Sequence, residues 1–86
     1  MTRDHIILEF KTFLIDIIGA DETLLTVDRD LLESNILDSY GILSMTVFME
    51  EKFGITIIPE EMTLENYRSL ANLTDLVLPK LADKEA

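Results

Sequence analysis

Apolar residues recur at helical spacing near the start of the chain. They are Ile6, Phe10, Phe13, Leu14 and Ile17. Apolar positions three and four residues apart form one face of an α-helix that packs on a core. We therefore predict a first helix over 4–18, with Thr2 as its N-cap and Gly19 as its stop.

The middle of the chain predicts a second helix, which runs from Ser39 to Phe53 and is stopped by Gly54. With about 100° between successive residues, one side of this helix carries a core stripe of Ile42, Met45, Met49 and Phe53. The opposite side presents a smaller apolar group rimmed by acids, made of Tyr40, Leu43 and Val47 with Glu50 and Glu51. Such a group indicates a docking surface, unless other elements nearly surround the helix.

Turn-forming residues and scattered apolar anchors fill the connection between these two helices. Over 20–38, aspartate and threonine alternate with leucine, valine and isoleucine. This pattern predicts a long loop packed onto the body, with a short helical turn at 30–33. A loop of this length inside a small domain is usually functional.

The segment after the second helix predicts an extended connection, a short element and a last helix. Residues 57–59 are expected to form an extended connection, because the residue before a proline avoids the α region, and 55–58 is the one β-like run. Residues 66–70 are expected to form a short helix or turn. The last helix opens at Ala71 or Asn72, and Pro79 should weaken, kink or end it. Its apolar positions are Leu73, Leu76, Val77 and Leu81.

These elements together predict an all-α fold in a single domain over 1–86. The expected architecture is a small four-helix bundle of three long helices and one short helix, with a long loop between helices 1 and 2. Tyr67 and Arg68 are expected in a plain surface turn, and 83–86 as a frayed, charged tail.

Composition narrows the classes of function. The 86 residues include 17 acidic, 7 basic and no cysteine side chains, for a formal charge of −10. A chain this short buries about 60% of its unfolded surface and forms one modest core, which leaves little material for the walled cavity of an enzyme. The charge disfavours nucleic acid and favours a partner with a basic patch. No apolar run approaches the ~20 residues of a membrane span, and the N-terminus lacks the uncharged core of a signal peptide. We expect a cytoplasmic monomer.

Residues that often signal catalysis or metal binding are better explained here as structure. His5 is the single histidine, so it has no partner of its own kind. Asp21, Asp28 and Asp30 do not have the spacing of a calcium loop and are expected as turn and cap residues.

The pair Asp38-Ser39 stands at the predicted start of the second helix. A helix N-terminus offers unpaired N–H groups and a positive dipole end, so a phosphate on Ser39 would be well placed. The pair alone favours an ordinary N-cap at Ser39. A capping box is absent, because Ile42 stands where Glu or Gln would be needed.

An ordered set of motifs between Leu31 and Leu76 resembles the acyl and peptidyl carrier proteins. The motifs are the Asp38-Ser39 pair, an apolar helix that ends in EEKFGI, an IPEE segment and an ENYRSL turn. The resemblance implies that Ser39 accepts 4'-phosphopantetheine from coenzyme A, and that Asp38 assists recognition by a phosphopantetheinyl transferase. It also implies the partner-facing residues, which are Tyr40, Leu43, Val47, Glu50 and Glu51.

The same resemblance implies a carrier and not an enzyme. The thiol of the arm would hold acyl or aminoacyl groups as thioesters, which an acyl- or aminoacyl-loading ligase or transferase supplies and downstream biosynthetic enzymes receive. The ILDS start and ENYRS ending are similar to discrete carriers of specialised pathways of the polyketide, nonribosomal or D-alanine type. Three features depart from the family. Tyr40 stands where Leu or Met is commoner, and Ser44 where many fatty-acid carriers have an acid. The residues before Asp38 are Ile36-Leu37, without the glycine often found there.

A different class of function fits the same surface. An unmodified acidic helical adaptor would bind a partner helix or groove through Tyr40, Leu43 and Val47. Covalent modification of Ser39 distinguishes the carrier from the adaptor.

Overall fold

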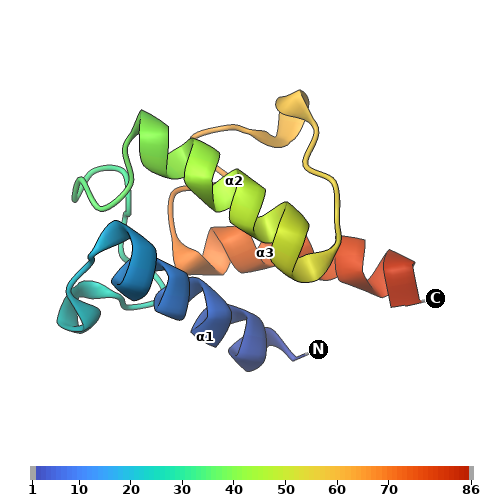
Figure 1. The fold of residues 1–86 in the computed structure, drawn as a ribbon, viewed down its shortest axis with the longest axis horizontal. Helices are drawn as coiled ribbons and strands as arrows, with labels where there is room; N and C mark the ends of the chain where they lie inside the picture. Colours follow the sequence, from blue (N-terminus) through green and yellow to red (C-terminus); the bar gives the residue numbers. More distant parts are fainter. Residues whose placement is uncertain (1, 86) are drawn as a thin grey trace.

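Three α-helices form most of the regular structure within residues 2–85. The computed structural model describes residues 2–85, and the side chains of residues 2–84. The helices are α1 (Arg3–Phe13), α2 (Ser39–Phe53) and α3 (Leu70–Glu85), and no strand occurs within 2–85. In Figure 1, α1 runs opposite to α2 and α3, and the long α1–α2 connection lies at one end of the bundle. The all-α prediction is confirmed, whereas the fourth, short helix is not formed.

Capping residues next to the helices set the start of α1 and both ends of α2. The Thr2 hydroxyl accepts the His5 N–H at 3.2 Å, as predicted. Helix α2 begins at Ser39, but its N-cap is Asp38, whose Oδ1 accepts the Gly41 N–H at 2.8 Å. The α2 helix ends where Gly54 takes a φ of 65°, a left-handed conformation that suits glycine.

Helix α3 is longer at both ends than its sequence pattern predicts. It starts at Leu70, after Ser69, whose Oγ accepts the Asn72 N–H at 3.1 Å. It does not end at Pro79 but continues to Glu85, so 83–85 are helical rather than frayed, and Ala86 lies outside the described residues. A proline removes one backbone hydrogen bond. Tertiary packing outweighs that loss, because buried side chains anchor the helix on both sides of the proline, Val77 before it and Leu81 after it.

The core lies between the three helices and is closed by anchors from the connections. Phe10, Met45, Met49 and Leu73 are fully buried, and Phe53 is nearly so, which confirms most of the core stripe predicted on α2. Further buried anchors come from the long loop and are Leu25, Leu31 and Leu37. The loop is therefore packed onto the body, as its anchors predict.

The long loop contains two short helical turns. The turn expected at 30–33 is closed by the Ser34 N–H, which donates to the Asp30 carbonyl at 3.1 Å, four residues earlier. A second one, a 3₁₀ turn at Glu22–Leu24, was not expected. The Asp30 carboxylate accepts two backbone N–H groups at 2.8 and 3.0 Å. The Asp21 carboxylate accepts the N–H of Thr23 at 2.9 Å, which lowers the pKa of Asp21. These bonds confirm that both aspartates shape turns.

Tyr67 differs from its prediction. Residues 64–67 form a turn, as one of the two expected outcomes, but the Tyr67 side chain is 0% exposed. Its hydroxyl lies 2.5 Å from Thr46 Oγ1 on α2, and Thr46 also donates to the Ile42 carbonyl at 2.8 Å. A buried tyrosine hydroxyl needs a polar partner, so this bond fastens the 62–69 connection to the inner side of α2.

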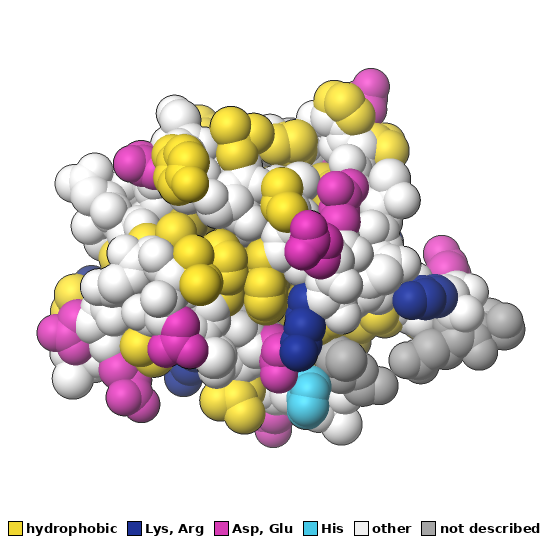
Figure 2. Space-filling model, in the orientation of Figure 1, with side chains coloured by type: hydrophobic (Ala, Val, Ile, Leu, Met, Phe, Trp, Pro, Cys, Tyr) yellow, Lys and Arg dark blue, Asp and Glu magenta, His cyan; other side chains and the backbone are white. Residues whose placement is uncertain are grey.

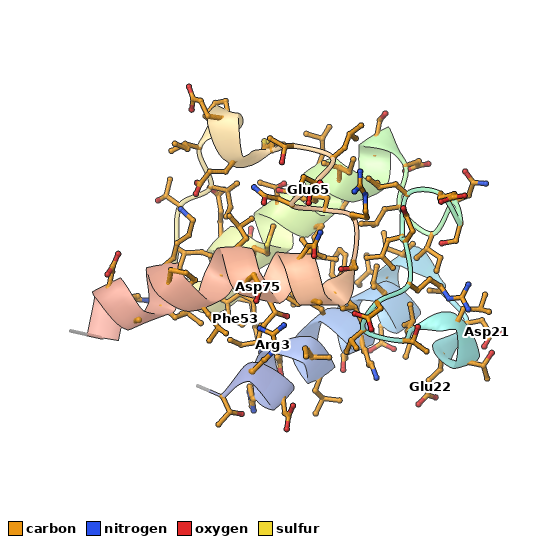
Figure 3. The ribbon with its side chains drawn as sticks, turned by 180° about the vertical axis from the view of Figure 1, so that it is seen from behind. Arg3, Asp21, Glu22, Phe53, Glu65 and Asp75 are labelled. Carbon is orange, nitrogen blue, oxygen red and sulfur yellow. The ribbon has the colours of Figure 1, made fainter. Side chains whose placement is uncertain are left out.

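Ion pairs link the helices at the surface. Arg3 on α1 and Asp75 on α3 point toward each other (Figure 3), with 2.6 Å between guanidinium and carboxylate. Glu9 on α1 lies 3.1 Å from the Lys52 ammonium on α2. Exposed pairs of this kind contribute about 0–1 kcal/mol each, so the buried apolar contacts determine the arrangement.

Candidate functional site

Ser39 is the first residue of α2, and its side chain is exposed. Because the Asp38 carboxylate fills the N-cap position, the interpretation of Ser39 as an ordinary N-cap is wrong. Within residues 2–85 the Ser39 hydroxyl makes no hydrogen bond to another group. The hydroxyl is therefore accessible to a reagent, and it does not contribute a hydrogen bond to the fold.

The start of α2 also offers what a phosphate requires. The first backbone bond of the helix runs from the Ile42 N–H to the Asp38 carbonyl at 2.9 Å, and the Gly41 N–H is bonded to the Asp38 carboxylate. The N–H groups of Ser39 and Tyr40 precede these bonds and have no acceptor inside the helix. Together with the positive end of the helix dipole, they suit an anion on Ser39 Oγ. An exposed primary alcohol at this position fits attachment of a phosphopantetheine group.

Gly41 and Leu37 hold this site in place. The sequence indicated Leu37 only as an apolar anchor of the loop, and no role was predicted for Gly41. Leu37 is buried, and its N–H donates to the Leu31 carbonyl at 2.8 Å. A Cβ atom added to Gly41 would lie 3.0 Å from Leu37 Cδ2 and 3.4 Å from Asp38 Oδ1. A glycine inside a helix lowers helix stability by about 1 kcal/mol relative to alanine. A glycine at position 41 of the sequence therefore indicated that a larger side chain would not fit there.

The outward face of α2 is exposed as its sequence pattern predicts. Tyr40 is 75% exposed, Leu43 58% and Val47 52%. Figure 2 shows hydrophobic side chains gathered along α2 and toward α1, with acidic side chains nearby. The alternative in which other elements nearly surround α2 is therefore excluded on this side.

The exposed apolar residues of α2 form one wall of a groove of about 540 Å³. The other wall comes from the end of α1 and the turn after it. The lining residues are Phe13, Ile17, Tyr40, Leu43, Ser44, Val47, Phe48 and Glu51. We call this feature the α1–α2 groove. It was not predicted, because sequence spacing places Ile17 in the core.

The two acids of the predicted partner face lie in different environments. Glu51 is exposed and lines the α1–α2 groove. Glu50 is half-buried, and its Oε2 accepts the Ile57 N–H at 2.9 Å. Glu50 therefore holds the 55–58 connection against α2, a role that periodicity along a helix does not reveal.

The inner side of α2 shows one perturbed group near these acids. Burial raises the pKa of Tyr67, the bond with Thr46 opposes the rise, and the carboxylates of Glu50 and Glu61 add to it. The hydroxyl therefore remains protonated and bonded to Thr46 at neutral pH. It supports α2 through its contact with Thr46.

The remaining candidate residues make no second site. His5 is exposed, with Nε2 3.8 Å from a Glu9 oxygen. Across the described residues, no group of three His, Cys, Asp or Glu side chains is placed to hold a metal ion. In the same part of the chain, no helix is both long and apolar enough to cross a membrane.

Comparison with known proteins decides the family. No family model matches the sequence. An acyl carrier protein of Petrotoga mobilis is 31% identical to this chain over 81 residues, which cover 94% of the chain and 93% of that protein. The chain belongs to the acyl carrier protein family.

Relatives of this carrier protein bear names from more than one branch of the family. A D-alanyl carrier protein of Lactococcus lactis subsp. cremoris is 34% identical over 81% of this chain and 94% of its own length. The polyketide-8 synthase acyl carrier protein 2 of Streptomyces avermitilis is 28% identical over 87% of this chain and 84% of its own length. These names confirm the family resemblance and support a carrier function, without selecting a cargo.

Proposed function

We propose that this protein is an acyl or aminoacyl carrier in which Ser39 bears 4'-phosphopantetheine. The observation that carries the proposal is the exposed, unbonded Ser39 hydroxyl at the first position of α2, with Asp38 serving as the cap. Family membership supplies the chemical context. When bound, the group provides a thiol that holds cargo as a thioester, which a chain without cysteine does not have in its side chains.

The residues around Ser39 have separate tasks in this proposal. Asp38 fixes the helix start and presents a carboxylate beside the hydroxyl for recognition by a phosphopantetheinyl transferase. The N–H groups of Ser39 and Tyr40 stabilise the attached phosphate. Leu43, Val47 and Glu51 contact partner enzymes, while Glu50 contributes mainly through its bond to the 55–58 connection.

We further propose a place for the carrier in specialised biosynthesis of the polyketide or nonribosomal type. The relative named as a polyketide synthase carrier supports this proposal. A loading ligase or transferase would supply the cargo and downstream biosynthetic enzymes would receive it. The −10 charge supports partners with basic docking patches, and the cysteine-free composition is in keeping with a cytosolic location.

Intact mass spectrometry tests the attachment directly. The protein is incubated with coenzyme A, magnesium and each of two unrelated broad-specificity phosphopantetheinyl transferases, with Ser39→Ala and Ser34→Ala in parallel. We expect one phosphopantetheine on the wild type and on Ser34→Ala, and none on Ser39→Ala. Because Ser39 is not the cap, Ser39→Ala should change stability by no more than about 0.5 kcal/mol.

Each other outcome has a definite meaning. Loading of Ser39→Ala would show that the attachment residue is wrong. No addition to the wild type with either transferase would reject the carrier proposal and favour the unmodified adaptor.

A further inference from the structure

The turn that follows α1 has an unusual geometry. Residues Leu14–Ile18 form a π-helical turn, which closes where the Gly19 N–H donates to the Leu14 carbonyl and Gly19 takes a φ of 85°. A π-helical bond spans five residues instead of four, so successive side chains are rotated less about the axis than in an α-helix. A π-type turn closed by a left-handed glycine is one way in which a helix ends.

The π-helical turn moves Ile17 out of the core. Sequence spacing places Ile17 on the same face as Phe13 and Leu14, and those two side chains are buried. Ile17 is instead 68% exposed. The prediction that Ile17 packs in the core is therefore wrong, and the changed helical period is the physical reason.

Ile17 is exposed at a particular place, the α1–α2 groove. There it stands in the wall opposite Tyr40, Leu43 and Val47, each of which is more than half exposed. Single exposed apolar residues are ordinary. Apolar side chains from two separate elements that line one groove beside an acid indicate an interaction site.

Charge limits what can occupy the groove. The chain has a net charge of −10, and Glu51 is the acidic residue in the lining of the groove. A second copy of the chain would bring the same negative charge to the contact, whereas a partner with a basic patch would be attracted. The groove also begins at Tyr40, next to Ser39, so an enzyme seated there has the attachment hydroxyl beside it.

We propose that Ile17, on the α1 side of the α1–α2 groove, is a specificity-determining contact for the phosphopantetheinyl transferase when that enzyme docks on α2 with a basic residue facing Glu51. This inference rests on the proposed function, since it concerns docking at the surface beside Ser39.

Steady-state kinetics of phosphopantetheine transfer test the role of Ile17. The wild type, Ile17→Ser and Ile17→Met are compared with Leu8→Ser, a matched control because Leu8 is 59% exposed on α1 and does not line the groove. We expect Ile17→Ser to raise KM roughly fivefold or more, the loss typical of a central interface contact. The kcat should stay unchanged, because Ser39 and Asp38 are unaltered. Ile17→Met should keep most of the affinity, and Leu8→Ser should match the wild type.

A charge variant tests the second half of the proposal. Glu51→Gln should raise KM at low ionic strength and have a smaller effect at high ionic strength, because salt screens exposed charges. An exposed acid away from the groove, changed in Glu60→Gln, serves as the control.

The outcomes separate this inference from the proposed function. If the wild type is modified and Ile17→Ser has an unchanged KM, or changes it no more than Leu8→Ser does, the groove proposal is overturned while the carrier function stands. If neither transferase modifies the wild type, the proposed function fails and this inference fails with it.

Discussion

Two substitutions at Asp38 separate its structural role from its proposed recognition role. The carboxylate caps α2 through the 2.8 Å bond to the Gly41 N–H and also stands next to the Ser39 hydroxyl. Asp38→Ala removes the acceptor and the charge together. Asp38→Asn removes the charge but leaves an amide oxygen at the same place, and asparagine is as good an N-cap as aspartate.

The structure sets the expected magnitudes. Loss of an N-cap acceptor costs about 0.5–2 kcal/mol, so Asp38→Ala should fall near the middle of that range. In a domain of this size each kcal/mol lowers Tm by about 4–8 °C. Asp38→Asn keeps the cap and loses only the attraction between the carboxylate and the helix dipole, about 0.3–1 kcal/mol. Urea denaturation and thermal unfolding measure both differences.

Transfer kinetics then decide the recognition role. We expect Asp38→Asn to remain folded and yet to be modified at least about tenfold more slowly than the wild type, a difference near 1.4 kcal/mol in activation free energy. Asp30→Asn is the matched control, because Asp30 also accepts backbone N–H groups in a turn, away from Ser39.

Two results would refute this reasoning. Modification of Asp38→Asn at the wild-type rate would show that the carboxylate acts only as a cap. Unchanged stability of Asp38→Ala would show that the bond to the Gly41 N–H does not stabilise α2.

Three further predictions concern the Tyr67–Thr46 contact, the ion pair between Glu61 and Lys80 of α3, and the outer face of α2. Tyr67→Phe should lower the free energy of unfolding by about 0.5–1.5 kcal/mol. Thr46→Val should lower it by about 1–3 kcal/mol, because it leaves the buried Tyr67 hydroxyl without a partner. If urea denaturation shows that Thr46→Val is the milder change, the assignment of this bond is contradicted. The bonds from Lys80 and the Ile58 N–H lower the pKa of Glu61 below 4.5, so Glu61 stabilises the fold above its unfolded pKa and loses this effect as pH falls through its folded pKa. Glu61→Gln should therefore be less stable than the wild type near pH ~7, with a deficit that shrinks as pH falls through the folded pKa of Glu61, and a deficit that does not change with pH would argue against the ion pair. Glu51→Lys should lower kcat/KM for the transferase more at low than at high ionic strength, and a loss independent of salt would argue against electrostatic steering.

The helix boundaries that could be predicted are those set by local chemistry. The cap at Thr2, the start of α2 at Ser39 and the stop at Gly54 depend on residues a few positions apart. Side-chain caps and left-handed glycines act at that range, so the sequence contains the whole signal. The sequence could not decide which residue caps α2, because Asp38 and Ser39 are both good N-caps. The backbone conformation of Asp38 decides it.

The features that could not be predicted depend on packing across the fold. Tyr67 lies in a segment with turn-like sequence, and its burial requires Thr46, 21 positions earlier, as a partner. Helix α3 passes through Pro79 because neighbouring turns are anchored in the core. The π-helical turn that exposes Ile17 has no residue signature of its own, since it begins as an ordinary amphipathic helix.

The candidate site was predictable because it is on the surface. The outer face of α2 follows from the period of one helix, and the position of Ser39 follows from one helix start. The second wall of the groove was missed because it needs the relative placement of two elements. Glu50 was interpreted as a contact residue for the same reason, since its bond to the Ile57 N–H joins α2 to a different segment.

The start of α2 combines an anchored backbone with an exposed hydroxyl, and the two properties have different causes. Leu37 is buried next to Gly41, and the Asp38 carboxylate accepts the Gly41 N–H, so the backbone on both sides of Ser39 is held in place. Ser39 takes no part in these contacts. A group attached to Ser39 Oγ therefore disturbs no bond of the fold, and its removal or exchange leaves α2 in place. An arm on Ser39, as proposed, would therefore move without disturbing the contacts that hold α2.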